Sequence, residues 1–285
     1  MTKFPLDALI DQAVKWLQIN YGESVDAFSA AFSDSINFVG DYLAMVPWWL
    51  IIIAFAIIAW RCNGWKLSLG TVIGLYIIYN LRLWPPFLDT LILVILSAAL
   101  SIIIGIPLGI MAAKSNKFHK GIAPILDVMQ TMPSFVYLIP ALLFFGIGRV
   151  PAVFSTIIFA MPPAIRFTDL GIRQVPTDLV EVGEAFGSSP GQLLWKIQMP
   201  VALPTIMAGI NQTVMLSLSM VVISAMIGAG GLGAGVLEAI SQLKIGMGFE
   251  YGIAVVIIAI ILDRISQGVG RSLGTVDKNN KEEQK

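Results

Sequence analysis

Charged side chains are scarce in this chain. Of its 285 residues, 13% are charged and 56% are apolar, and the mean hydropathy is +0.81. Soluble globular domains carry about 25% charged residues. Stretches such as 91–113 and 253–262 hold no charge at all, and a bilayer span needs about 20 mostly apolar residues. The composition therefore predicts an integral membrane protein and excludes a soluble enzyme.

Cysteine and histidine are almost absent as well. Cys62 is the single cysteine, so neither an internal disulfide nor a cysteine metal cluster can form within the chain. His119 is the single histidine, and we expect it to be solvated in its basic loop. The formal net charge is zero, which gives no reason to expect a nucleic acid partner. We predict no metal site, catalytic residue or cofactor on this chain.

The N-terminal segment does not have the pattern of a signal peptide, because Asp7 and Asp11 follow Lys3 where an uninterrupted apolar region would be required. Apolar residues recur there at helical spacing, with polar residues opposite. The apolar positions are Leu6, Leu9, Ile10, Ala13, Val14 and Leu17. This pattern predicts an amphipathic helix that lies on the membrane or packs against the bundle, within an extracytoplasmic tail at 1–45.

Seven apolar segments follow this tail. They lie at 46–62, 67–84, 88–113, 122–146, 150–166, 203–228 and 249–267. The sequence therefore predicts an all-α integral membrane protein, a bundle of about seven transmembrane helices. Residues 46–84 would form two peripheral helices and residues 85–268 a core domain, before a cytoplasmic tail at 269–285. Prolines inside several spans require neighbouring protein or water to satisfy the freed backbone groups, so the helices should enclose a shared interior.

Lysine and arginine are divided unequally between the two sets of loops. Thirteen of the 18 fall beyond the ends of the first, third, fifth and seventh spans, and five fall on the other side. Cytoplasmic loops carry the excess of positive charge. We therefore expect the N-terminus outside and the C-terminus in the cytoplasm.

A long polar stretch separates the fifth span from the sixth. It reads DLVEVGEAFGSSPGQLLWKIQMPVALPTI from Asp178 to Ile206. The pattern predicts a short helix at 176–186, a turn at Gly187, and a second helical stretch from Pro190 to about Gln198. The apolar positions of this stretch have no lipid to occupy and need either this protein's own helices or a partner's groove. They are Leu179, Val180, Ala185, Phe186, Leu193, Leu194 and Ile197.

The spacing within this loop resembles the EAA loop of permease subunits in ABC importers. Glu181, Gly187, Ile197 and Pro200 match that motif, whereas Val182 and Gly183 stand where the family has alanines, and Met199 stands where it has leucine. In that family the loop forms coupling helices that dock on a cytoplasmic ATPase. The resemblance assigns this role to the loop at 176–200. Its candidate residues are Glu181, Glu184, Ala185, Gly187, Ile197 and Pro200. For the two glutamates, a role as solvated surface acids is the alternative.

The likeness extends beyond the loop. Four stretches are similar to the glycine betaine/proline importer permeases, at 124–148, 159–176, 208–233 and 249–267. The resemblance implies a type I importer permease in a bacterial inner membrane. It would form a homodimer bound to two ATPase subunits, which carry ATP and Mg, and be fed by an extracytoplasmic binding protein. The solute would be an amine osmolyte such as glycine betaine, proline betaine, choline, carnitine or trimethylamine oxide.

One stripe in the sixth span and two residues in the fourth are candidates for lining a translocation pathway. Thr213, Ser217, Met220 and Ser224 share one helix face, and Gln130 and Met132 lie in the fourth span. Small hydroxyl residues also serve ordinary helix packing in membranes, so both interpretations of the stripe stay open.

Two further features have a structural and a functional interpretation. For Asp127, a structural pair or helix-end role is favoured over contact with solute. Gly228, Gly230 and Gly233 fit a dinucleotide fingerprint, but the motif follows an apolar span, not a strand. We expect a flexible or tightly packed loop there.

Two other classes of function would leave different marks on the sequence. An ATP-independent secondary transporter would require an inverted repeat and a buried charge relay. No convincing repeat is found, and Asp127 has no obvious partner within the membrane. A membrane-embedded enzyme would require a reactive pair or metal ligands, and none is visible. Within the ABC class, another small solute such as an amino acid remains an alternative.

Overall fold

The computed structural model describes residues 6–282, and every regular element in that range is helical, which confirms the all-α class. The long helices are α1 (Leu6–Met45), α2 (Trp48–Asn63), α3 (Trp65–Asn80), α4 (Trp84–Lys114), α5 (Asn116–Thr131), α7 (Arg149–Arg173), α10 (Met199–Ile223) and α12 (Ile245–Glu282). The shorter ones are α6 (Leu138–Phe145), α8 (Thr177–Ala185), α9 (Pro190–Leu193) and α11 (Gly231–Ser241).

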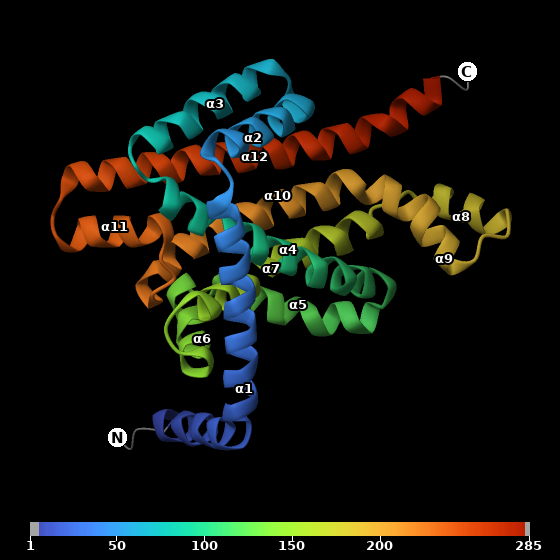
Figure 1. Cartoon of the computed structure of the whole chain (residues 1–285). Coiled ribbons are helices and arrows are strands. Elements are labelled where there is room, and N and C mark those ends of the chain that lie inside the picture. Colours follow the sequence, from blue (N-terminus) through green and yellow to red (C-terminus); the bar gives the residue numbers. More distant parts are fainter. Residues whose placement is uncertain (1–5, 283–285) are drawn as a thin grey trace.

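The centre of the molecule is α7, packed between α4 and α10 (Figure 1). Small residues allow this close approach, as is usual between membrane helices. A Cβ added to Gly105 of α4 would lie 2.7 Å from that of Ala164, and one on Gly209 of α10 would lie 2.6 Å from that of Phe167. In the most apolar stretch of α7, 67% of the residues are buried, against 17% in α12.

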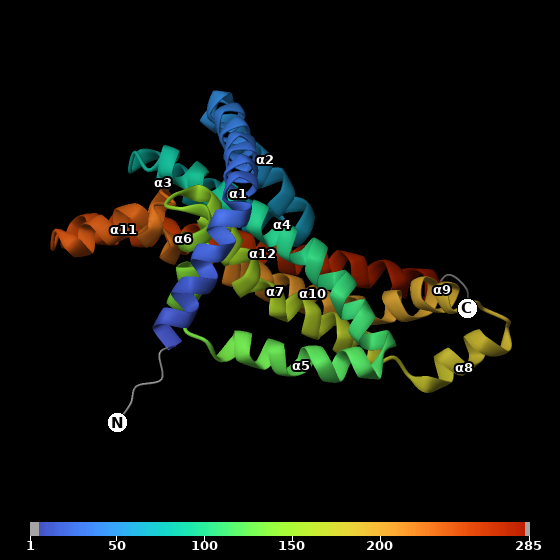
Figure 2. The same cartoon turned by 90° about the horizontal axis from the view of Figure 1, so that it is seen from below.

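The other helices surround this centre. α12 packs on α10, and the α2–α3 hairpin packs on α12, where a Cβ on Gly74 would lie 2.7 Å from the Cγ2 atom of Ile257. Figures 1 and 2 both show α1 crossing α4 and α7 at a steep angle. α8, α9 and the C-terminal end of α12 lie at one end of the bundle, whereas α11 and the start of α12 lie at the other.

α1 packs against the bundle at the end that carries α11 and the start of α12. The guanidinium of Arg149 at the start of α7 donates to Asp89 of α4 at 2.8 Å and to Asn37 of α1 at 3.0 Å. The ring of Phe154 on α7 also packs against Phe28 and Phe32 of α1. The predicted amphipathic face at Leu6–Leu17 falls on side chains outside the described residues, so only the helical backbone is described there.

Among the described residues, four helices are long and apolar enough to cross a membrane, and up to six if each of two bent pairs is one span. All seven predicted segments are helical. However, α2 and α3 have 16 residues each, fewer than the roughly 20 that a span needs. The prediction of about seven spans is therefore met only if these two short helices also cross.

The fourth predicted span is not one straight helix. Its two halves, Asn116–Thr131 and Ser134–Phe145, meet at an angle of 111°. Met132 is extended, with φ −70° and ψ 135°, because the residue before a proline is driven out of the helical region. The Tyr137 hydroxyl donates to the carbonyl of Met129 across the break, which fixes the bend.

Three boundaries also differ from the prediction. α7 continues past Arg166 to Arg173, because Thr168, Asp169 and Gly171 are buried against neighbouring helices. α9 runs into the sixth span through a π-helical turn at Leu194–Gln198, so that Pro190–Ile227 is one helical run. α12 remains helical as far as Glu282, through the predicted tail.

Candidate functional site

The hairpin at residues 177–198, the predicted coupling loop, has the predicted helix–glycine turn–helix form. α8 ends at Ala185, and Gly187 takes φ +76°, a left-handed conformation that glycine adopts without strain. The Ser188 N–H donates to the Gly183 carbonyl at 3.1 Å. Ser189 and Gln192 then form a capping box that starts α9. Local hydrogen bonds therefore fix the turn.

Gly183, which stands where the family motif has an alanine, lies in the tightly packed interior of the hairpin. Gly183 is buried, and an added Cβ would lie 2.5 Å from the Cδ1 atom of Ile197 and 2.8 Å from that of Leu193. Leu194 is buried against Ile172, near the end of α7. The hairpin is thus closed on itself and anchored on the ends of α7 and α10.

The outer face of the hairpin carries apolar side chains that this chain leaves uncovered. Phe186 at the tip is 88% exposed, Trp195 is 64% exposed and Val182 is 54% exposed. Glu181 and Glu184 are exposed beside them. Apolar groups gathered on a charged surface mark a protein interaction site.

The six predicted coupling residues lie in three different surroundings. Glu181, Glu184, Ala185 and Gly187 are exposed and lie together near the tip, whereas Ile197 is half-buried against Gly183 and supports the hairpin from inside. The sixth, Pro200, is exposed in the first turn of α10. The motif does not include Phe186 or Trp195, the two most exposed large apolar side chains of the hairpin.

The stripe of α10 has no exposed surface within the subunit. Thr213, Ser217, Met220 and Ser224 are all 0% exposed. The hydroxyls of Ser217 and Ser224 donate to carbonyls one turn earlier, at 2.9 and 2.8 Å. This arrangement favours helix packing over pathway lining.

The two candidates from the fourth span differ in their surroundings. Met132 packs against the buried cluster that contains Met220, so the structure brings these two candidates together. Gln130, two residues earlier and near the end of α5, is exposed.

A polar network between α5 and α7 was not predicted. Asp127 pairs with Arg166, so the expectation of a structural pair is confirmed, and Arg166 is the partner that the sequence did not identify. His119 Nδ1 lies 2.7 Å from Asp169 Oδ2, so His119 is not simply solvated. Arg173 Nε donates to the other oxygen of Asp169 at 2.7 Å. The Asp127–Arg166 and His119–Asp169 pairs join residues 39 and 50 positions apart, which spacing along the chain does not reveal.

The glycine-rich segment that fits a dinucleotide fingerprint is a tightly packed turn. The Leu232 N–H donates to the hydroxyl of Thr90 at 2.8 Å. A Cβ on Gly231 would lie 2.5 Å from that hydroxyl oxygen. The turn therefore packs on α4, as expected, and it begins α11, a helix that the sequence analysis did not predict.

Comparisons with known proteins agree with this architecture. Residues 105–274 match the family model described as "Binding-protein-dependent transport system inner membrane component". The chain is 49% identical over 269 residues to the glycine betaine transport system permease protein OpuAB of Bacillus subtilis (strain 168), which covers 94% of this chain and 95% of that one. It is 46% identical to the glycine betaine/proline betaine transport system permease protein ProW of Escherichia coli (strain K12), over 95% of this chain and 76% of that one.

Solved structures show the same fold. An inward-facing structure of the MetNI methionine ABC transporter matches with a TM-score of 0.61 and 20% identity, over 67% of this chain and 95% of that one. At this identity the likeness concerns the fold alone. The family match and the two near-full-length relatives show that the chain belongs to the family of binding-protein-dependent transport system inner membrane components.

Proposed function

We propose that this chain is the permease subunit of an ATP-driven importer of glycine betaine and related amine osmolytes. The observation that carries the proposal is the 49% identity, over almost the whole of both chains, to a glycine betaine permease. A glycine betaine/carnitine permease of Listeria monocytogenes is 50% identical over 94% of this chain. These relatives support a small amine osmolyte over an amino acid as the solute.

The exposed hairpin supports the following roles for the permease, the ATPase and the binding protein. A homodimer of this chain binds two ATPase subunits, which hold ATP and Mg, and each hairpin seats Phe186 and Val182 in an ATPase groove. ATP binding closes the ATPases and draws the paired hairpins together. The bundle then rocks from an inward-open to an outward-open state, accepts solute from the binding protein, and resets after hydrolysis. The uncovered apolar tip supports this role.

The orientation in the bacterial inner membrane follows from the same role. If the hairpin lies in the cytoplasm, the C-terminal end of α12 lies there too, because the two are at one end of the bundle (Figure 1). The start of α12 and α11 are then extracytoplasmic. The unequal division of lysine and arginine supports the same direction.

Uptake of radiolabelled glycine betaine tests the proposal. The cells lack their own osmolyte importers and carry the ATPase and binding protein of the same importer, with or without this chain. We expect uptake that requires this chain and that disappears with a hydrolysis-dead ATPase. Uptake that persists with the dead ATPase would indicate a secondary transporter. Uptake of a labelled amino acid but not of glycine betaine would contradict the substrate and leave the permease role standing.

A further inference from the structure

The turn between α11 and α12 lies at the end of the molecule opposite the coupling hairpin (Figures 1 and 2). Two backbone hydrogen bonds close it. The Lys244 N–H donates to the Ala239 carbonyl at 2.9 Å, and the Leu243 N–H donates to the Ile240 carbonyl at 3.2 Å. This is the Schellman pattern of helix termination, in which the residue after the helix is left-handed and usually glycine. Here that position is Leu243, with φ +55°.

Leucine is a poor choice for this position as far as folding is concerned. Its Cβ crowds the backbone in the left-handed region, and glycine does not have this strain. Packing of the side chain does not offset this strain either, because Leu243 is 87% exposed. A strained residue whose side chain the fold does not use points to a function for that side chain.

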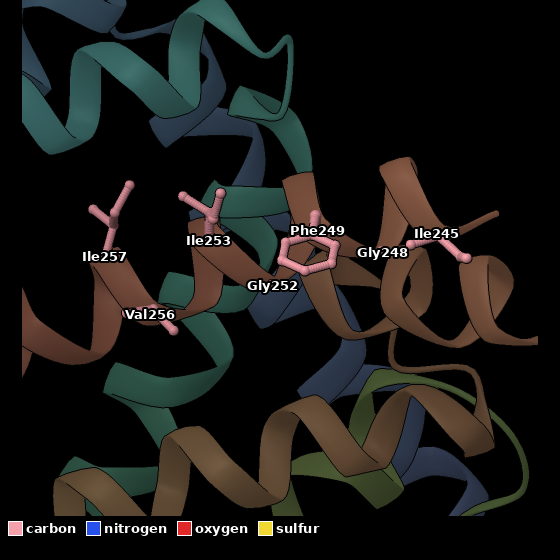
Figure 3. Close-up of a pocket in the computed structure, with 7 residues that line it drawn as sticks. All are labelled: Ile245, Gly248, Phe249, Gly252, Ile253, Val256 and Ile257. Carbon is pink, nitrogen blue, oxygen red and sulfur yellow. The ribbon is translucent and has the colours of Figure 1, made fainter.

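The surroundings of Leu243 resemble the centre of a protein interface. Ile240 is 67% exposed and Ile245 is 77% exposed next to it. Beyond the turn, the apolar face of α12 from Ile245 to Ile257 (Figure 3) belongs to a stretch that is long and apolar enough to cross a membrane, so the docking surface is limited to the turn itself. An apolar centre within a polar rim is the usual anatomy of a docking surface.

Charges around the turn place it outside the hydrocarbon layer. Glu238, Lys244 and Glu250 are all exposed within a few residues of Leu243. Charged side chains in the hydrocarbon core face a protein or water interior, because exposure to lipid is costly. The tip is therefore at the aqueous surface, where a soluble protein can reach it.

We infer that Leu243 is a principal contact for the soluble solute-binding protein. Its exposed side chain would bind in an apolar pocket on that protein's docking face. The occupant follows from the family, whose transport is binding-protein-dependent, and from the position of the turn at the end opposite the ATPase. The inference rests on the proposed function. The inference extends that function by naming the surface and the residue that the binding protein recognises on this chain.

Glycine substitution offers a sharp test, because Leu243→Gly removes the side chain and relieves the strain at the same time. The permease and its ATPase are placed in lipid nanodiscs. The probe is the binding protein of the same importer, loaded with glycine betaine. Its Kd for the complex and its stimulation of ATP hydrolysis are measured. The matched control is Arg82→Gly, because Arg82 is the other non-glycine residue with positive φ (60°) among the described residues. Leu243→Met is the conservative variant.

We expect Leu243→Gly to weaken binding by about tenfold or more, the effect of losing a central interface side chain. Stimulated hydrolysis should fall, while basal hydrolysis and the amount of folded complex stay the same. Leu243→Met and Arg82→Gly should stay within about twofold of the natural chain.

Two results would overturn the inference. An unchanged Kd for Leu243→Gly, with normal glycine betaine uptake by the natural chain, rejects the role of Leu243 and leaves the proposed function intact. Loss of the folded complex from the membrane, with normal binding by what remains, means that Leu243 contacts lipid. If the natural complex neither binds the probe nor takes up glycine betaine, the proposed function itself fails.

Discussion

The central helices and the coupling hairpin both depend on glycine for close packing, but they use it differently. At Gly109 in α4, an added Cβ would meet the backbone carbonyl of Ile165 at 2.7 Å and the Cβ of Thr168 at 2.6 Å. At Gly183 in α8, it would meet only the ends of flexible side chains. Other helices of the same chain cover the packed faces of the central helices, whereas no part of the chain that the structure describes covers the Phe186 side chain of the hairpin. The difference indicates that the centre supplies stability, and it supports the proposal that the hairpin supplies a surface for a partner.

The largest effect is expected at the centre. Gly109→Leu forces α4 away from the backbone of α7, and overpacking of this kind costs about 3 kcal/mol. We expect the variant not to accumulate in the membrane, as measured by immunoblotting of membrane fractions. Gly70→Leu is the control, because no atom lies within 4 Å of its added Cβ. Equal amounts of the two variants would contradict the account of the centre.

The next effect is a loss of uptake without a loss of protein. Phe186→Ser removes an exposed aromatic ring that makes no contribution to folding, and we expect uptake to fall by about 30-fold, as for an interface hot spot. Membrane levels should be unchanged. Phe186→Leu, which keeps an apolar side chain, should retain most of the uptake. A Phe186→Ser variant with normal uptake would show that the tip is not a docking surface.

A smaller effect is expected at the turn of the hairpin. Gly187→Trp places a bulky residue at φ +76°, where it strains the turn although the space around it is open. We expect uptake to fall by about tenfold with basal ATP hydrolysis retained, since hydrolysis becomes uncoupled from transport. Gly187→Asn should be milder, because asparagine tolerates the left-handed conformation. Normal uptake by Gly187→Trp would argue against the role of this turn.

The smallest effect is expected inside the hairpin. Gly183→Ala restores the residue of the family motif, and the Ile197 and Leu193 side chains can rotate away from the new methyl group. The cost should be below about 1 kcal/mol, in the range of tolerated core changes, with uptake within about twofold of the natural chain. A loss of protein as severe as that of Gly109→Leu would remove the distinction between the two regions.

The sequence predicts features that depend on neighbours along the chain. Apolar runs located the helical segments, and Gly187 with Pro190 located the hairpin. Contacts between distant segments were not predictable in this way. The pairing of Asp127 with Arg166 and the burial of Ser217 and its stripe depend on how α5, α7 and α10 face one another. The proline at 133 signalled an interruption, but not a bend of 111°.

In the candidate site, too, the sequence predicted the local features but not the contacts between segments. The motif identified the hairpin, because its glycine and proline spacing is local. It did not distinguish side chains that close the hairpin, such as Ile197, from those that face outward, such as Trp195. That distinction depends on how the π-helical turn at Leu194–Gln198 packs against α8.

Photocrosslinking from the hairpin tip tests the central claim most directly. A benzoylphenylalanine side chain replaces Phe186 in membranes that contain the ATPase subunit, with the same replacement at Ile147, which is 79% exposed in the α6–α7 loop, as the control. The account predicts a crosslinked product between this chain and the ATPase from position 186 and none from position 147. Crosslinks from position 186 to lipid or to a second copy of this chain, but not to the ATPase, would contradict it.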